Sequence, residues 1–144
     1  FAATRKAPSE LDENTFQKQF EDNLKTFIFL CQLKGVKPVL MTQASRLKAE
    51  PDESIRGHVE TMMMDKGLTY EKVREYFDAL NNSTRKIAAE SGTLLIDLDK
   101  HIPQTADMMF DSVHFTDMGC DAVAAVIAKQ LSEKCFAEAS QDKG

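Results

Sequence analysis

Two residues whose types suit proton transfer lie three positions apart near the end of this 144-residue sequence. Asp111 and His114 occur within the segment FDSVHFTDMG, residues 110–119. An Asp three residues before a His on a loop can fold back, so that its carboxylate binds an imidazole N–H, fixes the tautomer and stabilises the imidazolium. The pair therefore predicts acid–base chemistry, with His114 moving the proton and Asp111 orienting it.

The same spacing is compatible with two other interpretations. With twelve Asp and three His in the chain, chance alone yields about 0.25 occurrences of Asp-x-x-His, so the motif has a real false-positive rate. A surface turn capped by Asp would have this pattern, and so would two metal ligands. No third His or Cys stands at a ligand-like spacing, which disfavours a metal centre.

The remaining histidines and methionines are weaker candidates. His58 and His101 fall in predicted loops, where solvated or packing roles are commoner than catalytic ones. Five methionines could line an apolar acyl pocket, although gap-filling in a core is their commoner use. They are Met62, Met63, Met64, Met108 and Met109.

A nucleophile is not evident in the sequence. No Gly-x-Ser-x-Gly elbow is present. Ser45, which follows the first predicted strand, is the best internal candidate, whereas the side chain of Ser112 should point away from the imidazole. Cys120 falls in a predicted helix and reads as core, and the three cysteines together favour free, buried thiols over disulfides or a zinc site.

The sequence predicts the order helix, strand, helix, strand, helix. A capping box at Asn14 and Gln17 and an apolar stripe predict the first helix, and continuous apolar runs predict two buried strands. The expected helices span about 14–34, 69–91 and 116–135, and the expected strands span 36–42 and 93–98. Segment 43–68 is expected to be mainly loop, with a short helix as the alternative, and segment 99–115 is expected to be a loop.

Both predicted strands are apolar on both faces, as in a parallel sheet covered by helices on each side. Two strands cannot bury three amphipathic helices, because sheets usually contain about 4–6 strands. We therefore expect residues 1–144 to form the C-terminal portion of one α/β domain, with its first strands upstream of Phe1. The loops 43–68 and 99–115 would then lie at the carboxyl edge of the sheet, where α/β active sites gather.

Charge and hydropathy exclude two classes of partner. Eighteen basic and 23 acidic residues give a net charge of −5, which argues against nucleic acid as the main partner. No stretch approaches the roughly 18 consecutive apolar residues of a membrane-spanning helix.

Three stretches resemble the SGNH (GDSL-type) hydrolases, a family of esterases and acylhydrolases. They are the helix 16–33 followed by GVKPVLMT, the segment 81–98 with Arg85 and IDL at its end, and FDSVHFT through Gly119, which is the most specific. The resemblance covers most of the chain. It implies a three-layer α/β/α, flavodoxin-like parallel sheet, ester hydrolysis without a cofactor, and catalytic roles for Asp111 and His114.

The sequence departs from this family in lacking its Gly-Asp-Ser-type block and the Gly and Asn blocks of the oxyanion hole. The resemblance therefore implies a serine ester hydrolase in which this chain supplies the Asp and His of the triad. Its expected partners are a small-molecule ester and either the missing N-terminal segment or another copy of the chain. The alternatives are a non-catalytic α/β binding or scaffold module and a metal-dependent hydrolase with Asp111 and His114 as ligands.

Overall fold

The computed structural model describes residues 13–136. Its elements, in chain order, are α1 (Glu13–Leu33), β1 (Val39–Met41), α2 (Glu53–Met63), the 3₁₀ turn η2 (Met64–Lys66), α3 (Tyr70–Ser91), β2 (Leu94–Ile96), α4 (Leu98–His101), α5 (Asp117–Leu131) and the π-helical turn η3 (Ser132–Phe136). None of the helices in this part of the chain is long and apolar enough to cross a membrane.

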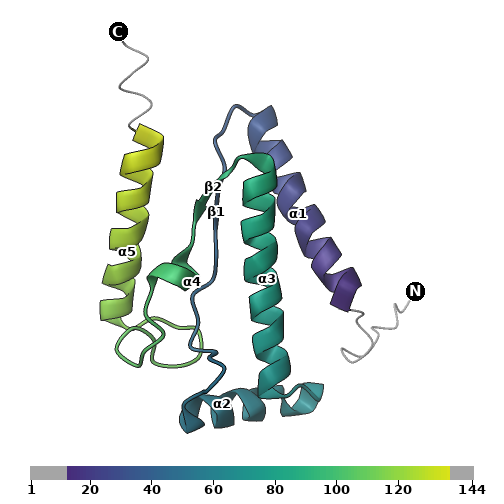
Figure 1. The fold of residues 1–144 in the computed structure, drawn as a ribbon, viewed down its shortest axis with the longest axis vertical. Helices are drawn as coiled ribbons and strands as arrows, with labels where there is room; N and C mark the ends of the chain where they lie inside the picture. Colours follow the sequence, from purple (N-terminus) through teal and green to yellow (C-terminus); the bar gives the residue numbers. More distant parts are fainter. Residues whose placement is uncertain (1–12, 137–144) are drawn as a thin grey trace, which may run out of the picture.

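The two strands form a small parallel sheet in a mostly helical structure, which agrees with the predicted α/β class. Val39 pairs with Leu94 and Met41 with Ile96. The crossover between β1 and β2 contains α2 and α3. Helix α5 lies on one side of the strands, and α1 and α3 lie on the other (Figure 1).

Each face of the sheet packs on a separate apolar cluster, as the continuous apolar strands predict. On one face, Ile96 and the half-buried Val39 pack with the apolar stripe of α5, including Val126 and Ile127. On the other face, a second cluster lies against α1 and α3; it comprises Ile28, Leu40, Ile87, Ala88, Leu24 and Leu95. Alternate residues of each strand therefore pack against helices on opposite faces of the sheet.

The segment 43–68 was expected to be mainly loop, with a short helix as the alternative, and the structure has an 11-residue helix there, α2. Ile55 and Val59, four residues apart, are buried against Tyr70 and Val73 of α3, which is the spacing of a helical face. Gly57 within α2 has open space where a side chain would lie. This glycine therefore lowers the local helix propensity without preventing the helix.

Capping explains why α3 and α5 begin where the sequence predicts. The Thr69 side chain accepts a hydrogen bond from the Lys72 N–H, and α3 ends at Gly92, which has φ +65°. The Thr116 side chain caps α5 by accepting from the Gly119 N–H. The N-cap predicted at Asn14 is wrong, because α1 already includes Glu13 and Asn14. The Gln17 amide donates to Ser83 of α3.

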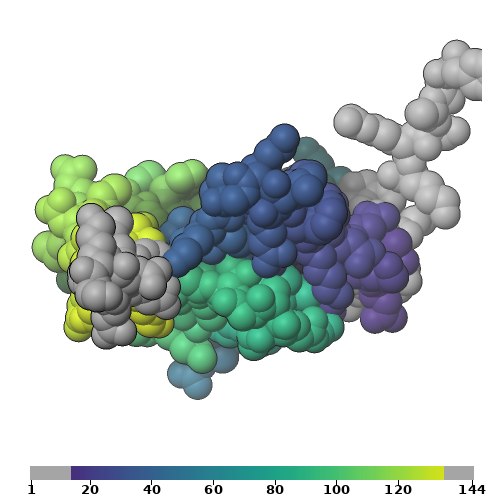
Figure 2. Space-filling model, turned by 90° about the horizontal axis from the view of Figure 1, so that it is seen from above, coloured from purple at the N-terminus to yellow at the C-terminus, as the bar shows by residue number. Residues whose placement is uncertain are grey.

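Both strands are shorter than their apolar runs. Val36, which was predicted to begin the first strand, is 55% exposed and lies before the paired residues. Figure 2 shows the blue residues that lead into β1 at the surface, above the teal end of α3. The chain from α1 through β1 also exposes several large apolar side chains: Phe27, Phe29, Leu30, Leu33 and Met41.

Candidate active site

The segment 108–116 forms a small hairpin between α4 and α5. Met109 and Phe115 form an isolated antiparallel bridge. The Phe110 N–H donates to the His114 carbonyl, and the Thr116 N–H donates to the Met108 carbonyl at 3.0 Å. The hairpin closes because these backbone bonds hold its two arms together.

The tip of this hairpin brings Asp111 and His114 together as the sequence predicts. One carboxylate oxygen of Asp111 accepts the backbone N–H groups of Val113 at 2.9 Å and His114 at 2.8 Å. The other oxygen lies 2.8 Å from Nδ1 of His114. The carboxylate thus organises the turn with one oxygen and orients the imidazole with the other.

The surroundings of Asp111 keep its carboxyl group ionised. Partial burial alone would raise the pKa of Asp111, but the backbone N–H groups of Val113 and His114 and the His114 imidazole outweigh it and lower the pKa to about 2. An ionised carboxylate accepts hydrogen bonds and cannot donate them. In the neutral imidazole, Nδ1 therefore carries the proton, and Nε2 has the free lone pair that a general base needs.

The His114 side chain is largely exposed to solvent. Its side chain is 69% exposed, compared with 22% for Asp111. The ring of Phe110 stacks on the imidazole, with a centroid separation of 5.7 Å and an interplanar angle of 14°. The ring orientation is thus constrained by a hydrogen bond at one edge and an aromatic contact on one face.

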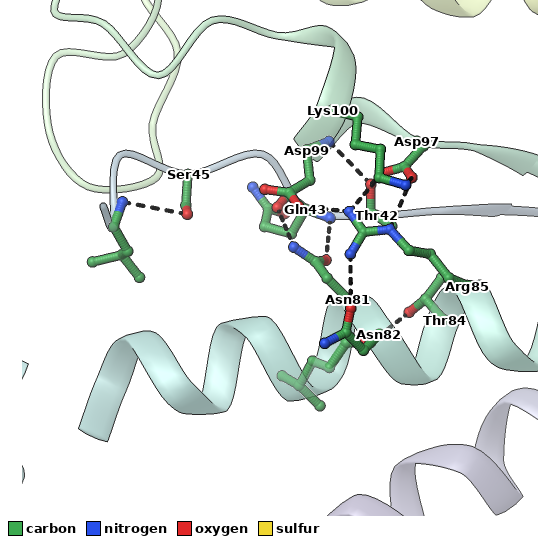
Figure 3. A network of polar contacts seen from close by, with 12 residues as sticks. Thr42, Gln43, Ser45, Asn81, Asn82, Thr84, Arg85, Asp97, Asp99 and Lys100 are labelled. Atoms are coloured by element: carbon green, nitrogen blue, oxygen red, sulfur yellow. Dashed lines mark hydrogen bonds and ion pairs between the residues drawn. The ribbon is translucent and has the colours of Figure 1, made fainter. Parts of the chain in front are cut away.

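The structure does not bring Ser45 to the imidazole. Ser45 is buried, and its hydroxyl accepts a hydrogen bond from the Leu47 N–H at 3.4 Å, apart from the neighbouring polar cluster (Figure 3). Among residues 13–136, no hydroxyl or thiol is hydrogen-bonded to His114, whose ring nitrogen contacts Asp111. Cys120 is exposed and Cys31 half-buried, so the expectation of buried thiols is wrong for these two, while Cys135 lies among residues whose side chains are not described.

The other histidines and the methionines do not join this site. His58 is exposed on α2, and His101 is exposed at the end of α4. Met108 and Met109 pack in the cluster beneath α5, whereas Met63 packs against the α2–α3 cluster. The methionines therefore belong to separate parts of the molecule and do not form one acyl pocket.

A polar network at the carboxyl ends of both strands supports the loops around the site (Figure 3). Arg85 of α3 binds Asp97 through two nitrogens, each at 2.8 Å, and Asp99 at 2.6 Å. The hydroxyl of Thr42 donates to Asp97 at 2.8 Å and accepts from the Asp99 N–H at 3.0 Å. Arg85 is foremost in lowering the pKa of Asp97 to about 2, with burial opposing and Thr42 assisting.

The loop that follows β1 is tied to α3 by a second set of contacts. Asn81 accepts from the Gln43 N–H at 2.8 Å and donates to the Gln43 carbonyl at 2.9 Å. The hydroxyl of Tyr70 donates to the Lys48 carbonyl at 3.0 Å. Sequence reasoning did not find these anchoring roles, although Asn81 and Arg85 fall in a stretch that resembles the hydrolase family.

Within the described residues, no group of three or more His, Cys, Asp or Glu side chains could hold a metal ion.

Comparison with known proteins adds no family assignment. No protein-family model matches the sequence, and no curated protein matches it either.

Proposed function

We propose that the intact protein is a serine ester hydrolase of the SGNH type, in which Asp111 and His114 form the acid–base half of the triad. The observation that carries the proposal is the 2.8 Å contact between the Asp111 carboxylate and Nδ1 of His114, in a hairpin that leaves the imidazole exposed. A carboxylate on Nδ1 and an accessible Nε2 are what a histidine general base requires.

In the proposed reaction, Nε2 of His114 takes the proton of a serine hydroxyl as its oxygen attacks the ester carbonyl carbon. The resulting imidazolium is stabilised by Asp111 and then protonates the departing alkoxide, which leaves as the alcohol. Water hydrolyses the acyl-enzyme by the same steps, so the serine is regenerated and a carboxylic acid is released. The serine and the oxyanion-hole donors would come from a segment upstream of the described residues.

We also propose that the two observed strands belong to a larger, flavodoxin-like parallel sheet between two helical layers. Helices lie on both faces of the strands, and β1 is paired only with β2 among residues 13–136. Phe27, Leu30 and Met41 are each about half exposed. Exposed apolar side chains on α1 and β1, together with a strand edge that has no partner, are typical of a surface that another element covers.

The test is hydrolysis of a short acyl ester, such as p-nitrophenyl acetate, by the full-length protein. We expect His114→Ala to lower kcat/KM by ~10³–10⁶. His101→Ala is the matched control, because His101 is also exposed but lies at the end of α4, and it should retain the wild-type rate. If His114→Ala keeps most of the activity, the assignment is wrong.

A fluorophosphonate probe would identify the nucleophile independently of the substrate. An activated serine oxygen displaces fluoride from phosphorus and remains covalently labelled, and the label is located by mass spectrometry. We expect labelling upstream of the described residues, and its loss in His114→Ala. Labelling of Ser45 would contradict the proposed division of the triad, and the absence of both labelling and turnover would favour a binding module.

A further inference from the structure

Arg46 is a buried cation in the loop between β1 and α2. The residue is 6% exposed. One terminal guanidinium nitrogen donates to the Met109 carbonyl at 2.9 Å, and the other binds the Asp52 carboxylate at 2.7 Å. Enclosing a charged side chain is unfavourable unless its partners compensate, so these two contacts account for where the guanidinium lies.

The backbone of the same residue makes a third contact with the hairpin that carries the candidate site. The Arg46 N–H donates to the Ser112 carbonyl at 2.9 Å. Met109 lies at the base of the hairpin, and Ser112 lies at its tip, between Asp111 and Val113. Arg46 therefore holds the hairpin at two carbonyl groups from one point on the neighbouring loop.

The loop that carries Arg46 is itself anchored to helix α3. The loop is attached to α3 on either side of Arg46, at Gln43 through Asn81 and at Lys48 through Tyr70. The hydrogen bonds within the hairpin set the distance between Asp111 and His114. They do not set the position of the pair relative to the sheet, which depends on the contacts of Arg46 and on the burial of Met109 with Ile96 in the cluster beneath α5.

The other contacts of Arg46 hold its guanidinium in place. The Nε of Arg46 is buried and has no hydrogen-bond partner among the described residues. Because a buried donor without a partner is destabilising, the position of the side chain depends on the bonds to Met109 and Asp52.

We propose that Arg46 is a positioning residue, which holds the Asp111–His114 hairpin in place at the carboxyl end of β1. The catalytic part of this inference rests on the proposed hydrolase function. The placement of the hairpin does not, and it can be measured in a protein with no turnover.

The test compares Arg46→Met with Arg56→Met in the full-length protein. Both substitutions remove a guanidinium that pairs with a carboxylate at 2.7 Å, but Arg56 binds Glu71 and lies on α2. In Arg46→Met, we expect kcat for p-nitrophenyl acetate to fall about 10–100-fold with little change in KM, because a displaced base misaligns the reaction. Arg56→Met should retain the wild-type kcat.

Nuclear magnetic resonance provides the readout that does not depend on activity. We expect the Nδ1–H proton resonance of His114 to persist in Arg46→Met, because the hydrogen bonds within the hairpin remain. The backbone amides of Phe110, Val113 and His114 should become more mobile on the nanosecond scale, with those of α3 unchanged. Arg46→Lys, which keeps the charge but has a single nitrogen, should lie between the wild type and Arg46→Met.

The outcomes separate this inference from the proposed function. A folded Arg46→Met protein with wild-type hairpin mobility would overturn the positioning role. If Arg46→Met does not fold, Arg46→Lys decides the question by the same two measurements. Lack of turnover in the wild type, with increased hairpin mobility in Arg46→Met, would reject the hydrolase and retain the positioning role.

Discussion

Gly119, in the first turn of α5, lies so close to the backbone carbonyl of Met108 that no Cβ fits between them. The same carbonyl accepts the Thr116 N–H. Helix α5 and the hairpin that carries His114 therefore meet backbone to backbone. The glycine is needed here for this close approach, and its φ is not in the left-handed region.

We expect Gly119→Ala to destabilise the protein by about 1–3 kcal/mol, because the added methyl group must displace the helix or the hairpin. Gly57→Ala is the matched control within α2. Nothing lies within 4 Å of the Cβ added there, so it should be neutral or stabilising by up to about 1 kcal/mol. Urea unfolding of both variants measures the difference. Equal midpoints would mean that α5 does not start against Met108.

In the intact protein, Asp111→Asn should lower ester turnover by ~10³–10⁴ with little loss of folding. The amide oxygen can still accept the N–H groups of Val113 and His114, so the turn is retained. The amide NH₂ then faces Nδ1, which favours the imidazole tautomer that lacks a lone pair on Nε2. Ester kinetics together with the Nδ1–H resonance of His114 provide the check. Full activity with that resonance missing would exclude an orienting role for the carboxylate.

Acid should weaken the contact between Arg85 and Asp97. The pKa of Asp97 is about 2 in the folded protein and about 3.9 in an unfolded chain. Its contribution to stability is therefore complete above about pH 4 and is lost as the pH falls towards 2. The difference corresponds to about 2–3 kcal/mol.

The variant that tests this pH dependence is Asp97→Asn. It should reduce the free energy of unfolding at pH 7 and flatten its decline between pH 4 and 2, as measured by urea unfolding at several pH values. Asp78→Asn is the control, since Asp78 is 58% exposed in its pair with Arg74 and such surface pairs contribute little. An unchanged acid slope in Asp97→Asn would contradict the interpretation.

Shortening an apolar side chain on α5 should reduce the stability of the protein less than shortening one on α3. Ile127 packs only partly buried on the cluster beneath α5, so Ile127→Ala should destabilise by about 1–2 kcal/mol. Ile87 is 1% exposed on the opposite face of the sheet. Ile87→Ala should therefore lower the free energy of unfolding by about 2–5 kcal/mol. Denaturation curves of the two variants give the comparison. A larger loss for Ile127→Ala would indicate that α5 is covered by something more than this sheet face.

The 144-residue chain by itself is expected to self-associate, because β1 has one edge without a partner strand among residues 13–136 and large apolar side chains on α1 and β1 are exposed. Leu30→Lys should reduce the association more than Met64→Lys, although Met64 is the more exposed of the two at 72%, because Met64 lies on η2 and away from the sheet. Size-exclusion chromatography with light scattering reports the state. A monodisperse monomer of the unaltered chain would refute the expectation.

The sequence was informative where structure depends on near neighbours. Helix α3 was predictable from Thr69 and Gly92 at its ends, and the Asp111–His114 contact from a three-residue turn. The strands were predicted too long, since an apolar run indicates burial, while only the residues that pair form the strand. The position and extent of α2 were not predicted, because Pro51, Gly57 and Gly67 indicate a loop, although Ile55 and Val59 have the helical spacing.

Long-range polar contacts could not be predicted in this way. Arg46 and Met109 are 63 positions apart, and an arginine in a loop is usually solvated. The network around Arg85 likewise depends on the two strands being adjacent, which becomes known only when the sheet is formed. The parts of the site that hold the hairpin in place are therefore the parts that no local pattern indicates.

The compactness of the hairpin determines which changes of sequence can alter the Asp111–His114 pair. Asp111 and His114 belong to one turn whose hydrogen bonds are internal, so insertions or deletions elsewhere in the chain leave their mutual distance intact. Such changes act instead on the segments that Arg46 and Gly119 touch, and they alter where the imidazole is directed. Under the proposed hydrolase function, divergence in the loop after β1 would thus direct the same Asp111–His114 pair towards differently shaped substrates, without changing the contact between the two residues.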